Sequence, residues 1–164
     1  MKIRNICAFL LLLVVTSSCT VSSEDVRIDG MGGVELVGVT LSQARLILKM
    51  TVANDSRARL TVRNGQLTVR DEKGEIARIA MDEEVVLKKK TATEIALPLT
   101  VRFTGGLGSV SAIPRLSADP GNLLLDGEIR VRGGSLGRKL KIQNMPLDDF
   151  LEMLGAANGD ILNL

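Results

Sequence analysis

The chain has 164 residues, with 21 Lys and Arg against 19 Asp and Glu, no His, Trp or Tyr, and 3 Phe. Because Lys2 and Arg4 lie in the N-terminal leader, the remaining chain is formally neutral and has no continuous Lys/Arg stripe, which argues against a nucleic-acid partner. The absence of His weakens hydrolase and zinc-site interpretations, and the lack of stacking aromatic residues weakens a sugar-binding one. We therefore expect no enzyme, cofactor or metal site.

Residues 1–18 predict a secretory signal peptide. A short cationic start containing Lys2 and Arg4 is followed by the apolar run Ile6–Val15 and by the small polar residues Thr16–Ser18. As a helix, this apolar run would cover roughly half of a ~30 Å hydrocarbon core. We therefore expect a targeting segment that is removed, not a permanent membrane span.

Cys19 follows the leader directly, and the small residues before it resemble the lipobox of bacterial lipoproteins. The resemblance implies that Cys19 is acylated, for example with palmitate, and becomes the first residue of a protein anchored in the outer membrane of the cell envelope. It leaves the membrane face, periplasmic or surface, open. Thr16 stands where Leu is usual, so ordinary signal-peptide cleavage is the alternative. Residues 19–33 are expected to form a polar, Gly-bearing tether.

Residues 34–143 predict a β-sandwich. Apolar residues occupy every second position from Ala44 to Val52, as in a strand with one face on a core, and Asn54-Asp55-Ser56 ends that strand with turn-forming side chains. Further strands are expected at Val34–Leu41, Arg59–Val62, Gln66–Val69, Ile76–Ala80, Glu84–Leu87, Glu94–Phe103, Leu123–Val131 and Lys139–Gln143.

Several connections between these strands have alternative interpretations. Asn64-Gly65 is either a two-residue hairpin turn or a bulge in one long strand. Asp71–Gly74 is predicted to be a tight turn, and Pro98 marks an edge or a bulge because it has no amide hydrogen. Lys88-Lys89-Lys90 is interpreted as a solubilising loop in preference to a binding site.

Residues 144–164 predict a C-terminal helix and tail. Leu147, Phe150, Leu151 and Leu154 form a helical stripe, with Asp148-Asp149 near the positive end. A second segment, Val110–Leu116, is either a short helix or a covering loop. The Gly-rich segments 105–108 and 133–137 lack the residues of a phosphate-binding loop and are expected to be ordinary loops.

Val52–Ser56, the Leu-Thr-Val repeats, the turn at Gly74 and Thr93–Leu99 together resemble the group 2 late embryogenesis abundant domain, also called the water stress and hypersensitive response domain. The resemblance implies an immunoglobulin-like or fibronectin type III-like sandwich with a short C-terminal helix, a bulge at Asn64-Gly65 and no catalytic residues. Asp55 stands where the family pattern has Pro. The family's proposed roles are desiccation protection and, in some members, binding of lipid or partner proteins.

Three functions follow as hypotheses. The first is a lipid-anchored, non-enzymatic envelope protein with a binding, stress-protective or scaffolding role, whose partners are the membrane through Cys19 and an envelope protein or a lipid. The alternative is an acyl-chain carrier that uses a cleft between the two sheets. A hydrolase using the acids Asp82-Glu83-Glu84 or Asp148-Asp149 is not supported, because neighbouring acids on a strand or helix do not face each other.

Overall fold

Antiparallel strands dominate the computed structural model, which describes residues 25–105, 108–118, 120–134 and 136–153. Cys19 and Leu154 lie outside these ranges. The strands are β1 (Val26–Val39), β2 (Gln43–Asn54), β3 (Leu60–Asp71), β4 (Gly74–Met81), β5 (Val85–Leu87), β6 (Thr91–Phe103), β7 (Leu124–Gly133) and β8 (Leu136–Pro146). The helices are α2 (Ser109–Ala118), the 3₁₀ turn η2 (Pro120–Asn122) and α3 (Leu147–Met153).

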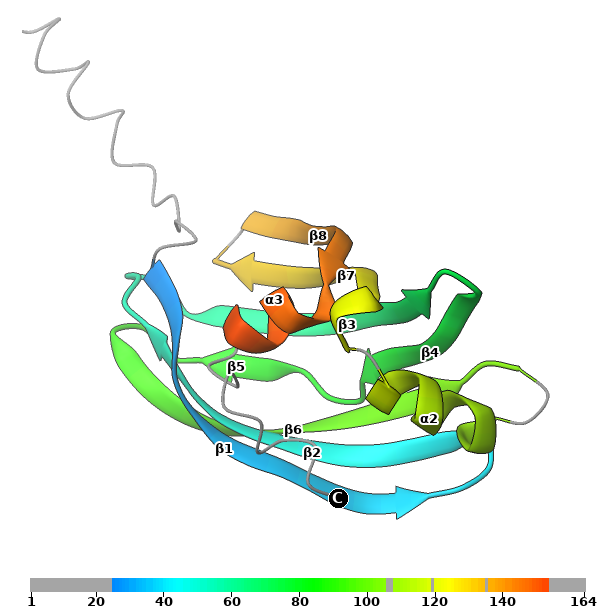
Figure 1. Ribbon diagram of the computed structural model, residues 1–164. Helices are drawn as coiled ribbons and strands as arrows, with labels where there is room; N and C mark the ends of the chain where they lie inside the picture. Colours follow the sequence, from blue (N-terminus) through cyan, green and yellow to red (C-terminus); the bar gives the residue numbers. More distant parts are fainter. Residues whose placement is uncertain (1–24, 106–107, 119, 135, 154–164) are drawn as a thin grey trace, which may run out of the picture.

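The strands form two layers joined through β4. Their hydrogen-bonded order is β1-β2-β6-β4-β3-β7-β8, and β5 also pairs with β3. In Figure 1, β1, β2 and β6 make the lower layer, while β3, β7 and β8 make the upper one. This arrangement, with α3 at the C-terminal end, confirms the predicted β-sandwich with a short C-terminal helix.

The space between the layers is filled by two clusters of apolar side chains. The inward row predicted for β2 is confirmed, because Ala44 and Leu46 belong to one cluster and Met50 and Val52 to the other. The most deeply buried side chains, each at most 1% exposed, include Leu60, Ile76, Leu123 and Leu125. Burying one such side chain stabilises a fold by about 1.5–3 kcal/mol, so these residues account for much of the cohesion between the layers.

The first strand starts earlier than the sequence pattern indicates. β1 pairs with β2 from Val26↔Asn54 to Val39↔Ala44, so Val26–Gly33 belong to the sandwich and the predicted tether 19–33 is too long. Val26, together with Ile28 and Met31, packs against the second core cluster. The sequence pattern does not indicate this part of the strand, because bulges beside Gly30 and Gly33 interrupt the alternation of apolar residues.

The segment Asn64-Gly65 is a bulge, and the hairpin alternative is wrong. β3 runs unbroken through it, with the register against β7 shifting between Arg63 and Gln66. Asn64 has the positive φ of 53° that a hairpin turn requires, but Gly65 does not share it, whereas the favoured two-residue type I′ turn needs positive φ at both central residues.

The predicted turn 71–74 is confirmed, whereas Pro98, predicted to mark an edge or a bulge, pairs with Ile47 of β2 without a bulge, at the end of the ladder with β4. The turn 71–74 brings Leu67 opposite Ile79 and Val69 opposite Ala77. Pro98 lies on β6 just beyond Leu99, where the ladder with β4 ends, and its carbonyl accepts a hydrogen bond from the Asp82 amide at 3.1 Å. The missing amide hydrogen of Pro98 therefore interrupts no pairing with β4.

Two helices cover the sandwich. α3 places Leu147 and Phe150 against the first core cluster, as the helical stripe predicts, and the Leu147 amide donates to the Leu123 carbonyl at 2.9 Å. The segment around Ala112 forms α2, not a covering loop, and buries Ala112 to 1% exposure.

Candidate functional site

Three cationic side chains lie in one row across β3, β7 and β8. The strand register places Arg63 opposite Arg130 and Arg130 opposite Lys139. Directly opposite residues have Cβ atoms about 4.5–5.5 Å apart on the same face of a sheet. The neighbouring Val62 and Val131 pack on the core, so the cations belong to the outer face.

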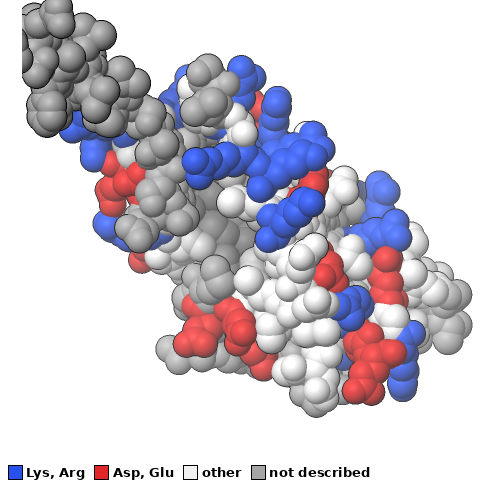
Figure 2. Space-filling model, turned by 90° about the horizontal axis from the view of Figure 1, so that it is seen from above, with Lys and Arg blue, Asp and Glu red and all other residues white. Residues whose placement is uncertain are grey.

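The same outer face carries two more cations. Arg132 follows Arg130 two residues along β7, and Lys141 follows Lys139 two residues along β8. We call these five exposed residues, Arg63, Arg130, Arg132, Lys139 and Lys141, the basic face. Viewed from above in Figure 2, Lys and Arg gather over the layer that contains β7 and β8.

One carboxylate, that of Glu128, lies within the basic face. Its Oε1 is 3.1 Å from Nη2 of Arg130 and 3.8 Å from Nζ of Lys139. The hydrogen bond from Arg130, with the added charges of Lys139 and Lys141, lowers the pKa of Glu128, which stays ionised at neutral pH. Against five cations it leaves a net formal charge of four positive on this surface.

The basic face differs from the rest of the sandwich in that its opposed cations extend over three adjacent strands. Like charges directly opposite each other destabilise a sheet, whereas opposite charges stabilise it. Elsewhere, described ion pairs are Arg27–Asp29, Arg27–Asp55, Lys49–Glu35, Arg70–Asp126, Arg78–Glu75 and Arg115–Asp71. Arg102 of β6 also lies directly opposite Arg78 of β4, so two like charges face each other there as well. A row of three opposed cations, with only Glu128 to offset them, departs from this local rule, and such departures are expected at binding surfaces.

The basic face lies at the end of the sandwich where the described chain begins. Val26 packs against the same core cluster as Val62 and Val131, which lie directly beneath the basic face. Figure 1 shows the start of β1 on the same side as the turn between β7 and β8. An N-terminal anchor would therefore be attached beside this surface.

The lysine segment 88–90 forms an exposed loop between β5 and β6, as predicted. It lies at the same end of the molecule, since the next residue, Thr91, pairs with Asn54, and Asn54 pairs with Val26. The loop adds cations to the end of the sandwich where the described chain begins.

The acidic residues considered for hydrolysis do not form a site. The carboxylates of Asp82, Glu83 and Glu84 are exposed, and Asp82 accepts a hydrogen bond from Thr100 Oγ1 at 2.8 Å. Asp148 and Asp149 are exposed on α3, a different element. Within the described ranges no group of three or more His, Cys, Asp and Glu could hold a metal ion.

The predicted lipidation site, Cys19, lies outside the described residues. The structure instead reveals the basic face, which corrects the sequence-based expectation that the chain has no Lys/Arg stripe. A signal was present: Arg130, Arg132, Lys139 and Lys141 flank the Gly-rich turn 133–137, so a hairpin there gathers them. The sequence does not indicate that Arg63 belongs to the basic face, because its position there depends on β3 lying beside β7.

A second exposed surface is apolar and lies where β1 turns into β2 beside α2. The Ser109 amide donates to the Leu41 carbonyl at 2.7 Å, which joins the two segments. Its exposed side chains are Leu36, Val37, Val39, Leu41, Val110 and Ile113. Exposed apolar side chains that gather in this way are common at protein contact sites.

No helix in the described part of the chain is long and apolar enough to cross a membrane. No protein-family model matches the chain, and neither does any curated protein. Among solved structures it is similar to a protein from Archaeoglobus fulgidus, with 16% identity over 71% of this chain and 96% of that one, and a TM-score of 0.42.

Two glycosidases also contain a similar region. A glycosyl hydrolase family 2 member from Bacteroides cellulosilyticus matches with 16% identity over 73% of this chain and a TM-score of 0.36. β-Glucuronidase 2 of Bacteroides uniformis matches with 15% identity over 72% of this chain and a TM-score of 0.35. This chain spans only 14% of each enzyme. Such similarities carry no information about what this chain binds.

Proposed function

We propose that this protein is a lipid-anchored, non-enzymatic protein of the cell envelope, held in the outer membrane through acylated Cys19, that binds an anionic partner through the basic face. The row Arg63–Arg130–Lys139 is the observation that carries this proposal. Glu128 offsets part of the repulsion among these three cations, and an anionic partner relieves the rest.

The proposal assigns binding, without covalent chemistry, to the mature domain. The chain has no His, and its two cysteines are Cys7, in the leader, and Cys19, at the anchor. The described acidic clusters considered above are exposed and lie on separate elements. Binding, stress-protective and scaffolding roles all fit the resemblance to the group 2 late embryogenesis abundant domain, and the apolar surface beside α2 suits a protein contact.

The anchor is tested by replacing Cys19 with Ala and growing cells with labelled palmitate. The natural chain is expected to take up label and to sediment with membranes washed in about 1 M salt, which screens the basic face, whereas the Cys19→Ala chain loses both properties. Each buried CH₂ contributes about 0.8 kcal/mol, so several acyl chains hold a protein firmly. Cys7→Ala, the matched control, keeps label and location. A Cys19→Ala chain that remains in the salt-washed membrane fraction would show that Cys19 is not the anchor.

The binding activity is tested with an unlipidated chain that begins at residue 19 and carries Cys19→Ser. Every described strand and both core clusters lie within 26–153, so this chain retains the whole fold. On a phosphate-bearing cation-exchange matrix, R63Q/R130Q/K139Q is expected to elute at lower salt than the parent. The control K73Q/R45Q/R102Q removes the same charge from exposed positions elsewhere and is expected to elute later than R63Q/R130Q/K139Q.

The carrier alternative predicts a different result. A protein that holds an acyl chain between its sheets should yield fatty acid or phospholipid on solvent extraction of the purified unlipidated chain, in amounts approaching one per protein. Neutralising the basic face would leave that content unchanged.

A further inference from the structure

We infer that the partner of the basic face is the anionic phospholipid headgroup layer of the membrane that holds Cys19, so that the outer surface of β3, β7 and β8 lies against the bilayer. This inference rests on the proposed function and deepens it, since it names the ligand of the same surface. A lipid anchor fixes only one point of the chain, and the basic face would fix the orientation of the sandwich.

The short segment between Cys19 and β1 is compatible with contact between the basic face and the membrane. Six residues lie between Cys19 and Val26, so seven Cα–Cα steps join them. Even fully extended, such a segment spans at most about 25 Å. Because Val26 lies at the same end as the basic face, an acylated Cys19 would hold this surface near the headgroups.

The shape and charge of the basic face suit an extended anionic surface. The cations project from three adjacent strands that are about 4.8 Å apart, so they present a row of charges to a plane. Each Lys or Arg near an anionic membrane strengthens binding by about five-fold. The effect reaches about 8–10 Å at physiological ionic strength, within the range of a tethered domain.

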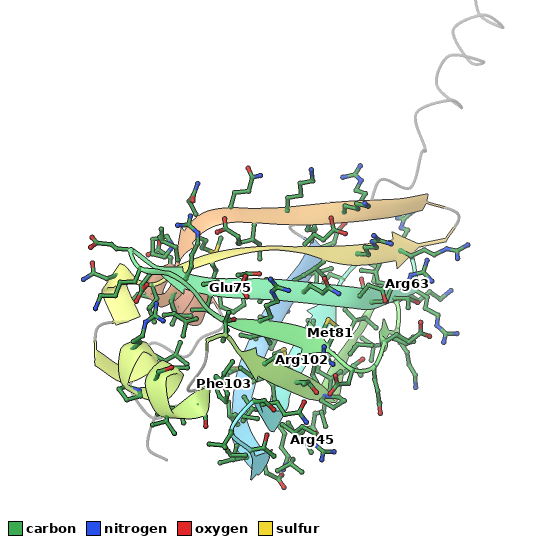
Figure 3. The ribbon with its side chains drawn as sticks, turned by 90° about the vertical axis from the view of Figure 1, so that its right-hand side faces the viewer. Arg45, Arg63, Glu75, Met81, Arg102 and Phe103 are labelled. Atoms are coloured by element: carbon green, nitrogen blue, oxygen red, sulfur yellow. The ribbon has the colours of Figure 1, made fainter. Side chains whose placement is uncertain are left out.

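A membrane fits this surface better than a nucleic acid does. Proteins that bind single strands stack bases on aromatic side chains. The chain has no Trp or Tyr, and Phe103 and Phe150 pack against the core cluster and are not part of the basic face. Figure 3 shows Phe103 well away from Arg63, on the α2 side of the molecule.

The test measures sedimentation of the unlipidated chain, residues 19–164 with Cys19→Ser, with two kinds of vesicle. One kind is pure phosphatidylcholine, and the other contains phosphatidylglycerol. We expect binding to the phosphatidylglycerol vesicles at about 0.1 M salt and its loss at about 1 M, where the screening length falls to about 3 Å. Binding to phosphatidylcholine should be negligible.

Variants then locate the contact. R63Q/R130Q/K139Q should bind phosphatidylglycerol vesicles about a hundred-fold more weakly, as the loss of three charges at five-fold each implies. The control K73Q/R45Q/R102Q carries the same net charge and should retain most of the affinity, since Arg45 and Arg102 lie on β2 and β6, apart from Arg63 (Figure 3). R63K/R130K, which keeps the charge, should bind like the parent. Circular dichroism confirms that each variant is folded.

Three results would overturn the inference. They are equal binding to both kinds of vesicle, an equal loss of binding in the two triple variants, and displacement of the protein from vesicles by duplex DNA or by inorganic phosphate at matched phosphate concentration. Because the tested chain carries no lipid, these results are independent of palmitate labelling. Failure of the anchor and failure of the membrane contact are therefore distinguishable.

Discussion

Arg115 of α2 forms a bidentate ion pair with the carboxylate of Asp71 at the end of β3. Its Nε lies 2.9 Å from Oδ2 and its Nη2 lies 2.5 Å from Oδ1, and Nη2 also approaches the Gly74 carbonyl at 3.4 Å. A bidentate pair of this kind is directional, so it fixes α2 against the turn between β3 and β4. These hydrogen bonds lower the pKa of Asp71.

This lowered pKa predicts a pH dependence of stability. A carboxylate whose pKa is lower in the folded state stabilises the fold above its unfolded pKa, about 3.9 for Asp, and loses that effect as pH falls through the folded value. We therefore expect the natural chain to melt at a higher temperature than Asp71→Asn at neutral pH, and the difference to vanish in strong acid. Thermal melts of both chains across the acidic range measure this difference.

The control for the ion pair is Arg78→Gln, which removes an exposed cation from the pair with Glu75. Exposed pairs contribute little, so its effect on melting should be smaller than that of Arg115→Gln. A difference between Asp71→Asn and the natural chain that stayed constant down to the lowest pH would contradict the assignment.

Gly127 on β7 is predicted to tolerate no side chain. A Cβ there would lie 2.1 Å from the Gln66 carbonyl oxygen, which belongs to the backbone and cannot move aside. Overpacking typically costs about 1–3 kcal/mol, and we expect Gly127→Ala to reach or exceed the upper end of that range. Urea unfolding measures the loss.

Two other glycines provide the comparison. At Gly65 the nearest atom to a new Cβ would be Sδ of Met81, at 2.4 Å, and the flexible thioether chain can shift, so Gly65→Ala should cost less. At Gly137 nothing lies within 4 Å, and Gly137→Ala should change stability by no more than about 0.5–1 kcal/mol. Equal losses at Gly127 and Gly137 would show that β3 and β7 do not approach so closely.

Local sequence patterns determine much of this fold. The period-two row from Ala44 to Val52, the turn 71–74 and the helical spacing of Leu147 and Phe150 each follow from interactions within a few residues, and each is confirmed. The start of β1 was missed because its glycines interrupt the apolar pattern, and only pairing with β2 keeps that segment in the sheet.

The basic face depends on contacts that no local pattern contains. Arg130 and Lys139 lie on neighbouring strands, and the short turn between β7 and β8 brings them opposite each other. The position of Arg63 beside Arg130 requires knowing that β3 pairs with β7, and the bulge after Arg63 sets the register. Shifting that register by one residue would turn Arg63 toward the core.

Asn54 is the buried polar residue that closes the end of β2. It is 0% exposed, and its Nδ2 donates to the carbonyls of Ala58 at 2.9 Å and Leu87 at 3.3 Å. Its Oδ1 accepts from the amide of Ser56 at 3.2 Å and from the Ser56 hydroxyl at 2.6 Å. The predicted turn at 54–56, held by its own side chains, is confirmed, and the same amide also ties it to β5.

Replacing Asn54 with Leu keeps a similar volume but removes all four hydrogen bonds. The Ser56 hydroxyl can still donate to the Ala58 carbonyl, which it already approaches at 3.1 Å. The Leu87 carbonyl and the Ser56 amide, in contrast, each lose the hydrogen bond to Asn54. A buried polar group deprived of its partner costs about 1–3 kcal/mol, and we expect a total loss of about 2–4 kcal/mol. In urea unfolding the midpoint should fall while the slope is unchanged. The control is Gln143→Leu, the same kind of change at an exposed position of β8, which should change the free energy of unfolding by no more than about 0.5 kcal/mol. An equally small effect of Asn54→Leu would mean that this hydrogen-bond network does not stabilise the sandwich.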